Sequence, residues 1–214
     1  LVEVDPAGNE VRRISIWKLF DPKKDPIHAS RRRWEWTHVN SIDVNPAGDI
    51  AFSARQMNRV GVIDGKTGAL TLKFTDVHGQ HHVTWVDDDH IHVFDNGETS
   101  SRVIEIQVST GEITWTYKGK PVHQFFSSYI SGAERLWSGS VLVCEGASGR
   151  LFEVTRDGDV VWEWINPFEN KRRNGDVSVT IYRAHRYPAD HPAFVGRSLD
   201  PGKFEKLNKA HGLR

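Results

Sequence analysis

The sequence predicts an all-β fold made of four-stranded antiparallel blades, as in a β-propeller. The first observation is a hairpin pattern that recurs four times: a β-branched run, a polar turn closed by glycine, and a second strand that usually ends in aromatic residues. It covers Leu1–Asn9, Val60–Ala69, Val103–Glu112 and Leu151–Asp159. Strand repeats of roughly 40–50 residues are typical of propellers and related arrays.

The second observation is another hairpin before each of the last three copies of this pattern. These hairpins join short apolar runs by turns of Pro, Asp or Gly, and they cover residues 41–54, 83–94 and 130–144. Such turn residues suit loops of two to four residues. Together the two kinds of hairpin predict three complete blades, over residues 38–74, 81–117 and 127–164.

Two incomplete blades are predicted at the ends of the chain. Leu1–Trp17 has the pattern of the outer half of an earlier blade, and Val177–Tyr187 that of the innermost strand of a later one. The two fragments could close into one mixed blade, or blades upstream of Leu1 could complete the ring. Three and a half blades close poorly, which favours the second alternative.

Irregular segments join and follow the blades. Asp21–Arg33 and Phe168–Asp176 lack strand periodicity and are expected to be loops. Beyond the blades the pattern gives way to prolines. We therefore assign residues 1–187 to propeller blades and residues 188–214 to an irregular C-terminal tail, with a short helical stretch at Lys203–Ala210.

The composition excludes several classes of protein. Lys and Arg together number 28, as do Asp and Glu, and this balance argues against a nucleic-acid partner. No apolar run approaches the roughly 18–20 residues of a membrane span. The single cysteine, Cys144, lies in an apolar run and is expected in the core. Leu1 begins in mid-strand, so the lack of a signal peptide is uninformative.

Chain direction predicts which polar residues meet at the mouth of the central channel. The face opposite the turns at Gly48, Asp89 and Gly139 collects the starts of the inner strands and the loops after the second strands. These segments are rich in His, Asn, Arg and Ser, which suit an oxyanion such as sulfate, phosphate or carboxylate. The candidate binding residues are Asn40, Arg55, His81, Asn96, Tyr129 and Glu145.

Each candidate also has a structural interpretation. His81 and His82 are adjacent and would face opposite ways in a regular strand, so we expect no metal site. Asn96 begins an Asn-Gly pair that is typical of turns. Arg55 and Arg102 could instead be ion-pair partners between blades, with Glu145 as their counter-ion.

A set of motifs in fixed order carries a resemblance to a known family. The motifs are Trp36–Ser41, Ser53–Arg55, Gln80–His82, Phe94–Gly97, Ser101–Arg102, Ser131–Leu136, Val143–Gly146 and Phe152–Val154. Over about residues 34–190 the chain resembles the bacterial arylsulfotransferase family. That resemblance implies a six-bladed propeller of which this chain is the C-terminal portion. It also implies a periplasmic or secreted protein.

The resemblance implies a reaction as well. The family moves a sulfuryl group from a phenolic sulfate ester to another phenol through a channel histidine, without a nucleotide donor, so we expect no cofactor. His38 and His82 lie on the family's channel-histidine motifs and Arg102 on its channel arginine. His185 is the remaining later candidate for the nucleophile, although it lies deeper along its strand; at the place of His38, the third blade has Tyr129.

The sequence leaves two alternatives to the transferase. A non-catalytic propeller could bind a ligand or partner protein through the same polar mouth. A quinone-cofactor dehydrogenase is disfavoured, because the chain has no Gly-Trp docking repeat after Ala-x-Asp. For the transferase, the expected partners are a small phenolic sulfate and a phenol. A homo-oligomer or upstream blades would complete the ring.

Overall fold

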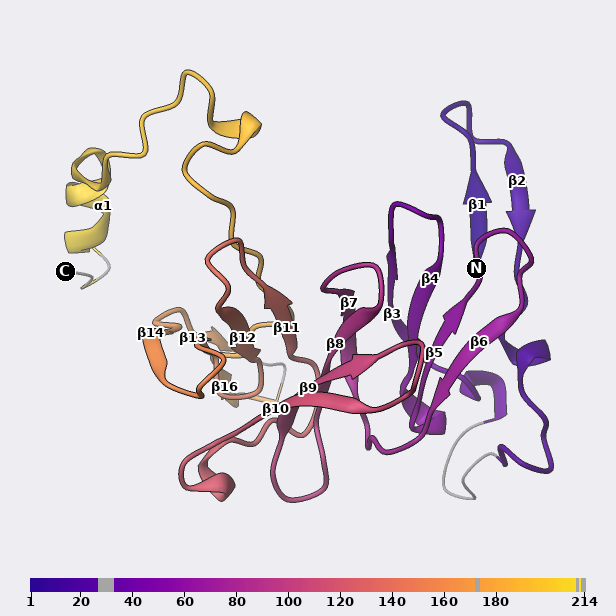
Figure 1. The fold of residues 1–214 in the computed structure, drawn as a ribbon. Helices are drawn as coiled ribbons and strands as arrows, with labels where there is room; N and C mark the ends of the chain where they lie inside the picture. Colours follow the sequence, from indigo (N-terminus) through magenta and orange to yellow (C-terminus); the bar gives the residue numbers. More distant parts are fainter. Residues whose placement is uncertain (27–32, 172–173, 211, 213–214) are drawn as a thin grey trace. The chain divides into compact units, whose positions relative to one another are not determined.

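A computed structural model describes residues 1–26, 33–171, 174–210 and 212. It is mostly β, with 37% strand. The chain divides into two units, Leu1–Ala184 and His185–Arg214. The strands belong to the first unit (Figure 1). Residues 27–32 of the predicted loop at 21–33 lie outside the described residues.

Three four-stranded antiparallel sheets follow one another along the chain, which confirms the three predicted blades. The first blade consists of β3 (Val39–Val44), β4 (Ile50–Ala54), β5 (Arg59–Ile63) and β6 (Leu70–Phe74). The second consists of β7 (His81–Trp85), β8 (His90–Asp95), β9 (Arg102–Gln107) and β10 (Ile113–Lys118). The third consists of β11 (Gly132–Arg135), β12 (Val141–Glu145), β13 (Arg150–Val154) and β14 (Val160–Ile165).

The first strands of the blades lie side by side. β3 packs against β7, and β7 packs against β11. Side chains of β3 accept hydrogen bonds from backbone amides at the unpaired edge of β7. Ser41 Oγ accepts from the Val83 amide at 2.9 Å, and Asp43 Oδ2 accepts from the Trp85 amide at 2.7 Å. Inner strands therefore meet as in a propeller, with polar side chains protecting an unpaired edge.

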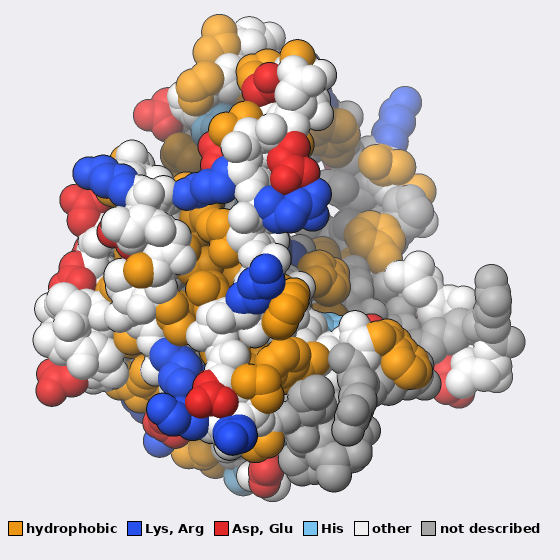
Figure 2. Space-filling model, turned by 90° about the vertical axis from the view of Figure 1, so that its right-hand side faces the viewer, with side chains coloured by type: hydrophobic (Ala, Val, Ile, Leu, Met, Phe, Trp, Pro, Cys, Tyr) orange, Lys and Arg blue, Asp and Glu red, His pale blue; other side chains and the backbone are white. Residues whose placement is uncertain are grey.

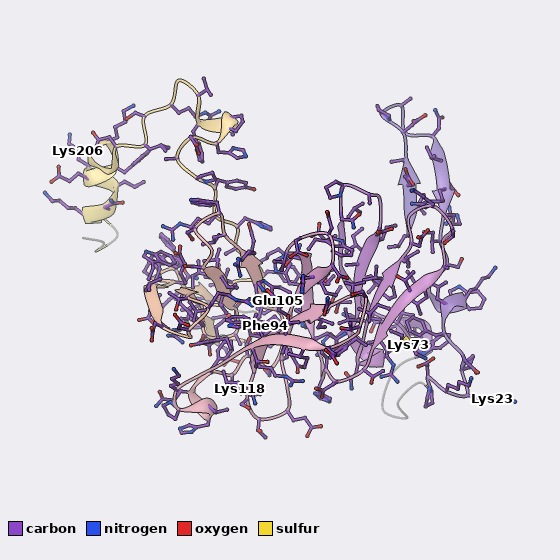
Figure 3. All side chains as sticks on the ribbon, in the orientation of Figure 1. Lys23, Lys73, Phe94, Glu105, Lys118 and Lys206 are labelled. Atoms are coloured by element: carbon purple, nitrogen blue, oxygen red, sulfur yellow. The ribbon has the colours of Figure 1, made fainter. Side chains whose placement is uncertain are left out.

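Apolar cores fill the space between blades. The core between the second and third blades is aromatic: the ring centroids of Phe94 and Phe125 are 5.5 Å apart, and those of Phe125 and Phe152 are 5.7 Å apart. Figure 3 labels Phe94 within this packed region. Cys144 is buried as predicted, and burial raises the pKa of its thiol to about 12.

The N-terminal segment packs on the first blade. β1 (Val2–Val4) and β2 (Glu10–Arg13) form a hairpin, and a 3-10 helix, η1 (Ile16–Leu19), follows. Phe20, which follows η1, packs edge-to-face with Phe52, and their ring centroids are 6.2 Å apart. An apolar groove of about 310 Å³ lies between the hairpin and the first blade. Figure 2, viewed from this side, shows apolar side chains exposed among charged ones.

The predicted strand at Val177–Tyr187 is wrong. A strand forms only at Val177–Ser178 (β16), where it pairs with β15 (Asn170–Lys171) inside the predicted loop. No neighbouring strand pairs with the rest of that segment in the part of the chain that the structure describes, and isolated strands are unstable in water. The proposed mixed blade does not form either, because β1–β2 and β15–β16 are separate sheets.

Short helices complete the description. In the first unit these are the 3-10 helices η2 (Arg33–Glu35), η3 (Arg55–Met57) and η4 (Val122–Gln124). The second unit contains η5 (Pro192–Phe194), η6 (Pro201–Phe204) and α1 (Glu205–Ala210). Among the described residues, no helix has the length and apolar character needed to cross a bilayer.

Candidate functional site

A left-handed residue stands at the start of each inner strand. The φ angle is +43° at His38, +52° at His82 and +88° at Ser131. Such conformations cost about 1–3 kcal/mol in residues other than glycine, and they cluster at functional sites. The strand register also shifts between His81 and Thr84, and bulges of this kind redirect side chains. The strand is therefore irregular at His81 and His82.

His81 is buried and uncharged at neutral pH. Its Nδ1 lies 2.8 Å from Asn96 Oδ1. Burial, together with electrostatic interactions with Arg55 and His38, lowers the pKa of His81 to about 4. The Asn96 bond and the Gly79 backbone act in the opposite direction without reversing the shift. The result is a neutral imidazole that lies within the electrostatic influence of Arg55.

His38 lies beside these groups on the first blade. The Arg55 amide donates to the His38 carbonyl at 3.1 Å, which holds the two residues together. The His38 ring is half-buried, with Nδ1 3.4 Å from Gln56 Nε2 and 3.9 Å from Glu35 Oε2. We call His38, Arg55 and His81 the mouth cluster. Sequence reasoning gave Gln56 no role beside His38.

His82 lies against the third blade. Its ring covers Gly132, where an added Cβ would come within 2.2 Å of His82 Nδ1. His82 is only 3% exposed, so its ring is enclosed at the contact between two blades. The structure thus places His82 in an interface, and its catalytic role stays a prediction.

Asn40 joins the first blade to the residue before His81. Its Nδ2 donates to the Gln80 carbonyl at 2.8 Å, and Ser53 Oγ donates to the same oxygen at 3.2 Å. Gln80 is fully buried, and its own Nε2 donates to the Arg59 carbonyl. The donor of Asn40 is therefore used between blades. Gln80 had no assigned role, although it precedes the predicted histidine pair.

Asn96 is held by the segment that leads into the third blade. It is 1% exposed, and its Nδ2 donates to the carbonyls of Ser127 at 2.7 Å and Ile130 at 3.1 Å. Tyr129 lies in the same segment; its carbonyl accepts from Ser127 Oγ at 2.9 Å, while its side chain is exposed. The amide of Asn96 is engaged inside the protein at each of its polar atoms.

Arg102 is bound by two carboxylates. Its Nε lies 2.8 Å from Asp95 Oδ2, and its Nη2 lies 3.1 Å from Asp76 Oδ2. Glu145 pairs with Arg150 at 3.3 Å and accepts from the Phe126 amide. The expectation that Glu145 is the counter-ion of Arg102 is therefore wrong, because Arg102 has carboxylates of its own.

The position of Arg102 recurs in the other blades. Arg59 and Arg150 also begin the third strand of their blades, and each pairs with a carboxylate at 3.3 Å. An ion pair repeated in every blade favours an architectural role for Arg102. Its assignment to sulfuryl binding stays a prediction.

His185 is the first residue of the second unit, and its role stays a prediction. Within the described residues no three His, Cys, Asp or Glu side chains gather as metal ligands.

The chain matches the arylsulfotransferase (ASST) family over residues 2–167, most of its length. The chain belongs to the arylsulfotransferase family. A search of curated proteins found no match. The match to the family confirms the resemblance that the ordered motifs carry.

Solved structures place this arylsulfotransferase-family chain among propeller-like folds. It is similar to a virginiamycin B lyase from Staphylococcus aureus, with 16% identity, a TM-score of 0.53, and coverage of 84% of this chain and 55% of that one. A protein of unknown function from Bacteroides caccae shares 17% identity over 65% of this chain and 51% of that one, with a TM-score of 0.48. The chain thus spans about half the length of these structures, and the likeness concerns the fold alone.

Proposed function

We propose that this arylsulfotransferase-family protein transfers a sulfuryl group between phenolic compounds, with His81 as the nucleophile. The observation that carries the proposal is the mouth cluster: a buried neutral imidazole that interacts electrostatically with Arg55 and His38. Neutral imidazole is a competent nucleophile, and a covalent step divides one difficult displacement into two easier ones. Arg55 supplies positive charge where the sulfuryl oxygens gain negative charge.

The reaction would proceed in two balanced steps. A ring nitrogen of His81 bonds to sulfur as the S–O bond to the aryl group breaks, and the electron pair leaves on the phenolate oxygen. His38, in its charged form, gives that oxygen a proton. In the second step the acceptor phenol returns its proton to His38 as its oxygen bonds to sulfur. The N–S bond then breaks, and its electron pair returns to His81.

The family match also supports the setting and partners of this reaction. Family membership points to phenolic substrates and to a periplasmic or secreted protein. The described arc has three blades, so we propose that further blades or a second copy complete the ring.

The test is turnover of p-nitrophenyl sulfate with phenol as acceptor. Replacing His81 by Ala should lower kcat/KM by roughly 10³-fold or more, since nucleophile removal has effects of at least that size. His90→Ala is the matched control, because His90 is bound to Asp87 at the opposite turn and should retain wild-type turnover. Equal activity of the two variants would refute His81. Absence of turnover over a panel of phenols would favour the non-catalytic binding propeller.

A further inference from the structure

The orientation of the Asn96 amide is fixed by chemistry. Its Nδ2 faces the carbonyl oxygens of Ser127 and Ile130, which can only accept hydrogen bonds. Both N–H groups are thereby used, and the atom that faces His81 must be Oδ1. An amide oxygen also only accepts, so the 2.8 Å contact requires a proton on His81 Nδ1.

We propose that Asn96 is a positioning residue that keeps the proton of neutral His81 on Nδ1 and so leaves the lone pair on Nε2. A neutral imidazole has one N–H, and its location follows from the partner of the other nitrogen. Asn96 gains a role different from substrate binding. That Nε2 is the atom that attacks sulfur rests on the proposed function; the tautomer itself does not.

A buried network keeps Asn96 in place. The Asn96 carbonyl accepts from Ser101 Oγ at 2.8 Å, and the same hydroxyl accepts from the Ser127 amide at 2.9 Å. Ser131 Oγ donates to Ser127 Oγ at 2.7 Å and accepts from the Gly146 amide at 2.9 Å. Asn96 and these three serines are at most 2% exposed. Satisfied buried networks hold one geometry, so the third blade fixes the acceptor that faces His81.

The groups around His81 explain why an amide suits this position. Arg55 and His38, from the first blade, lower the pKa of the ring. The Gly79 backbone, from the preceding loop, and Asn96, from the same blade as His81, raise it. A carboxylate in place of Asn96 would favour the charged imidazolium, which has no lone pair to react. Asn96 orients the ring without adding that charge.

The first test is the ¹⁵N NMR spectrum of the histidine side chains at neutral pH, with Asn96→Leu as the variant. In the wild-type protein we expect Nδ1 of His81 to be protonated and Nε2 to be unprotonated. Asn96→Leu removes the acceptor and should produce a mixed or reversed tautomer. Asn45→Leu is the matched control: Asn45 is also buried, but it accepts from Asp49 in a distant turn, so His81 should keep the wild-type pattern.

A second variant covers the case in which Asn96→Leu fails to fold. Asn96→Asp retains an acceptor oxygen and adds charge, so the NMR titration midpoint of His81 should rise. A bare Nδ1 in the wild-type protein, an unchanged tautomer in folded Asn96→Leu, or an unshifted midpoint in folded Asn96→Asp would each overturn the proposal.

Kinetics separate this inference from the proposed function. In a rapid-mixing experiment, Asn96→Leu should slow the first release of p-nitrophenol by about 10²-fold or more, as expected for a histidine in the wrong tautomer. The expected tautomer in a protein without turnover would support the inference and refute the transferase. Turnover by a protein whose His81 Nδ1 is unprotonated would support the transferase and refute the inference.

Discussion

At the scale of single residues, His38, His81 and His82 differ because their neighbours differ. His81 contacts the amide oxygen of Asn96, and it is uncharged at neutral pH. His82 lies enclosed over Gly132, and His38 is half-buried beside Gln56. Residue type alone does not distinguish them. Burial and the nearest polar atom determine which imidazole can act as a nucleophile.

The low pKa of His81 predicts the pH dependence of the first chemical step. Because burial moves the pKa from 6.5 to about 4, the neutral ring is present at and above about pH 5. We expect kcat/KM for the aryl sulfate to be flat on the acid side until the pH approaches 4, and then to fall about tenfold per unit. A midpoint near the ordinary value of 6.5 would contradict this environment for His81. An NMR titration of the same ring checks the assignment directly.

Gly132 predicts a steric effect on stability. A methyl group there would lie 2.2 Å from His82 Nδ1, and the His82 ring is confined. Gly132→Ala should lower the free energy of unfolding by roughly 1–3 kcal/mol, measured as a shift of the urea midpoint. Since the clash needs both groups, adding His82→Ala should recover part of the loss. If Gly132→Ala lowers the free energy of unfolding equally with His82 present and with His82→Ala, the contact with His82 is not responsible.

At the scale of strands, the blades could be predicted because their signals are local. Turn residues and alternating apolar runs lie within each hairpin, and the structure has all three blades where they indicate. Val177–Tyr187 carries the same pattern, but among the described residues only Val177 and Ser178 have a strand partner, β15, so only these two residues form a strand. A local sequence pattern cannot show whether a partner strand is present.

The site was less predictable for the same reason. His, Asn and Arg at the ends of strands pointed to the mouth. The orientation of Asn96 depends on Ile130, and one carboxylate of Arg102 comes from Asp76; both contacts are distant along the chain. Sequence spacing therefore predicts a polar region, but it cannot predict which nitrogen of which histidine is available.

The bonds from β3 to β7 predict how adjacent inner strands are joined. Asp43 Oδ2 accepts from the Trp85 amide, and the Asp43 carbonyl accepts from Trp85 Nε1 at 3.3 Å. Asp43→Ala leaves that amide without its acceptor, so the free energy of unfolding should fall by about 1–3 kcal/mol. Asp88→Ala, an exposed turn change of equal charge, should have an effect within about 0.5 kcal/mol. If Asp43→Ala and Asp88→Ala change the free energy of unfolding equally, the bond from the Trp85 amide makes no measurable contribution to stability.

At the scale of the whole first unit, an ionic cluster links the second and third blades. Glu105, labelled in Figure 3, accepts from His92 Nε2 at 3.0 Å. Arg156 of the third blade donates to both Glu105 oxygens, at 2.6 and 2.8 Å, and its guanidinium covers the Trp115 ring. His92 is fully buried. One carboxylate thus gathers groups from two blades.

This cluster should make the join between the blades sensitive to acid. Burial acts to raise the pKa of Glu105, but hydrogen bonds from His92 and Arg156 outweigh it and hold that pKa below its ordinary value of 4.5. Burial also lowers the pKa of His92 below 6.5. A folded-state pKa below the unfolded value stabilises the protein above the unfolded value and ceases to do so as the pH falls. Both groups therefore predict a decline that begins below about pH 6.5 and steepens below 4.5.

Glu105→Gln isolates the contribution of the carboxylate. At pH 7 we expect it to lower the free energy of unfolding by about 2–3 kcal/mol, because hydrogen bonds to a charged group are lost. Below pH 4.5 the wild-type and variant curves should converge, since the wild-type carboxylate loses its charge on unfolding there. Glu112→Gln, at an exposed position after the same strand, should follow the wild-type curve throughout. Parallel curves for Glu105→Gln and the wild-type protein from pH 7 to 3 would show that this carboxylate does not hold the second and third blades together.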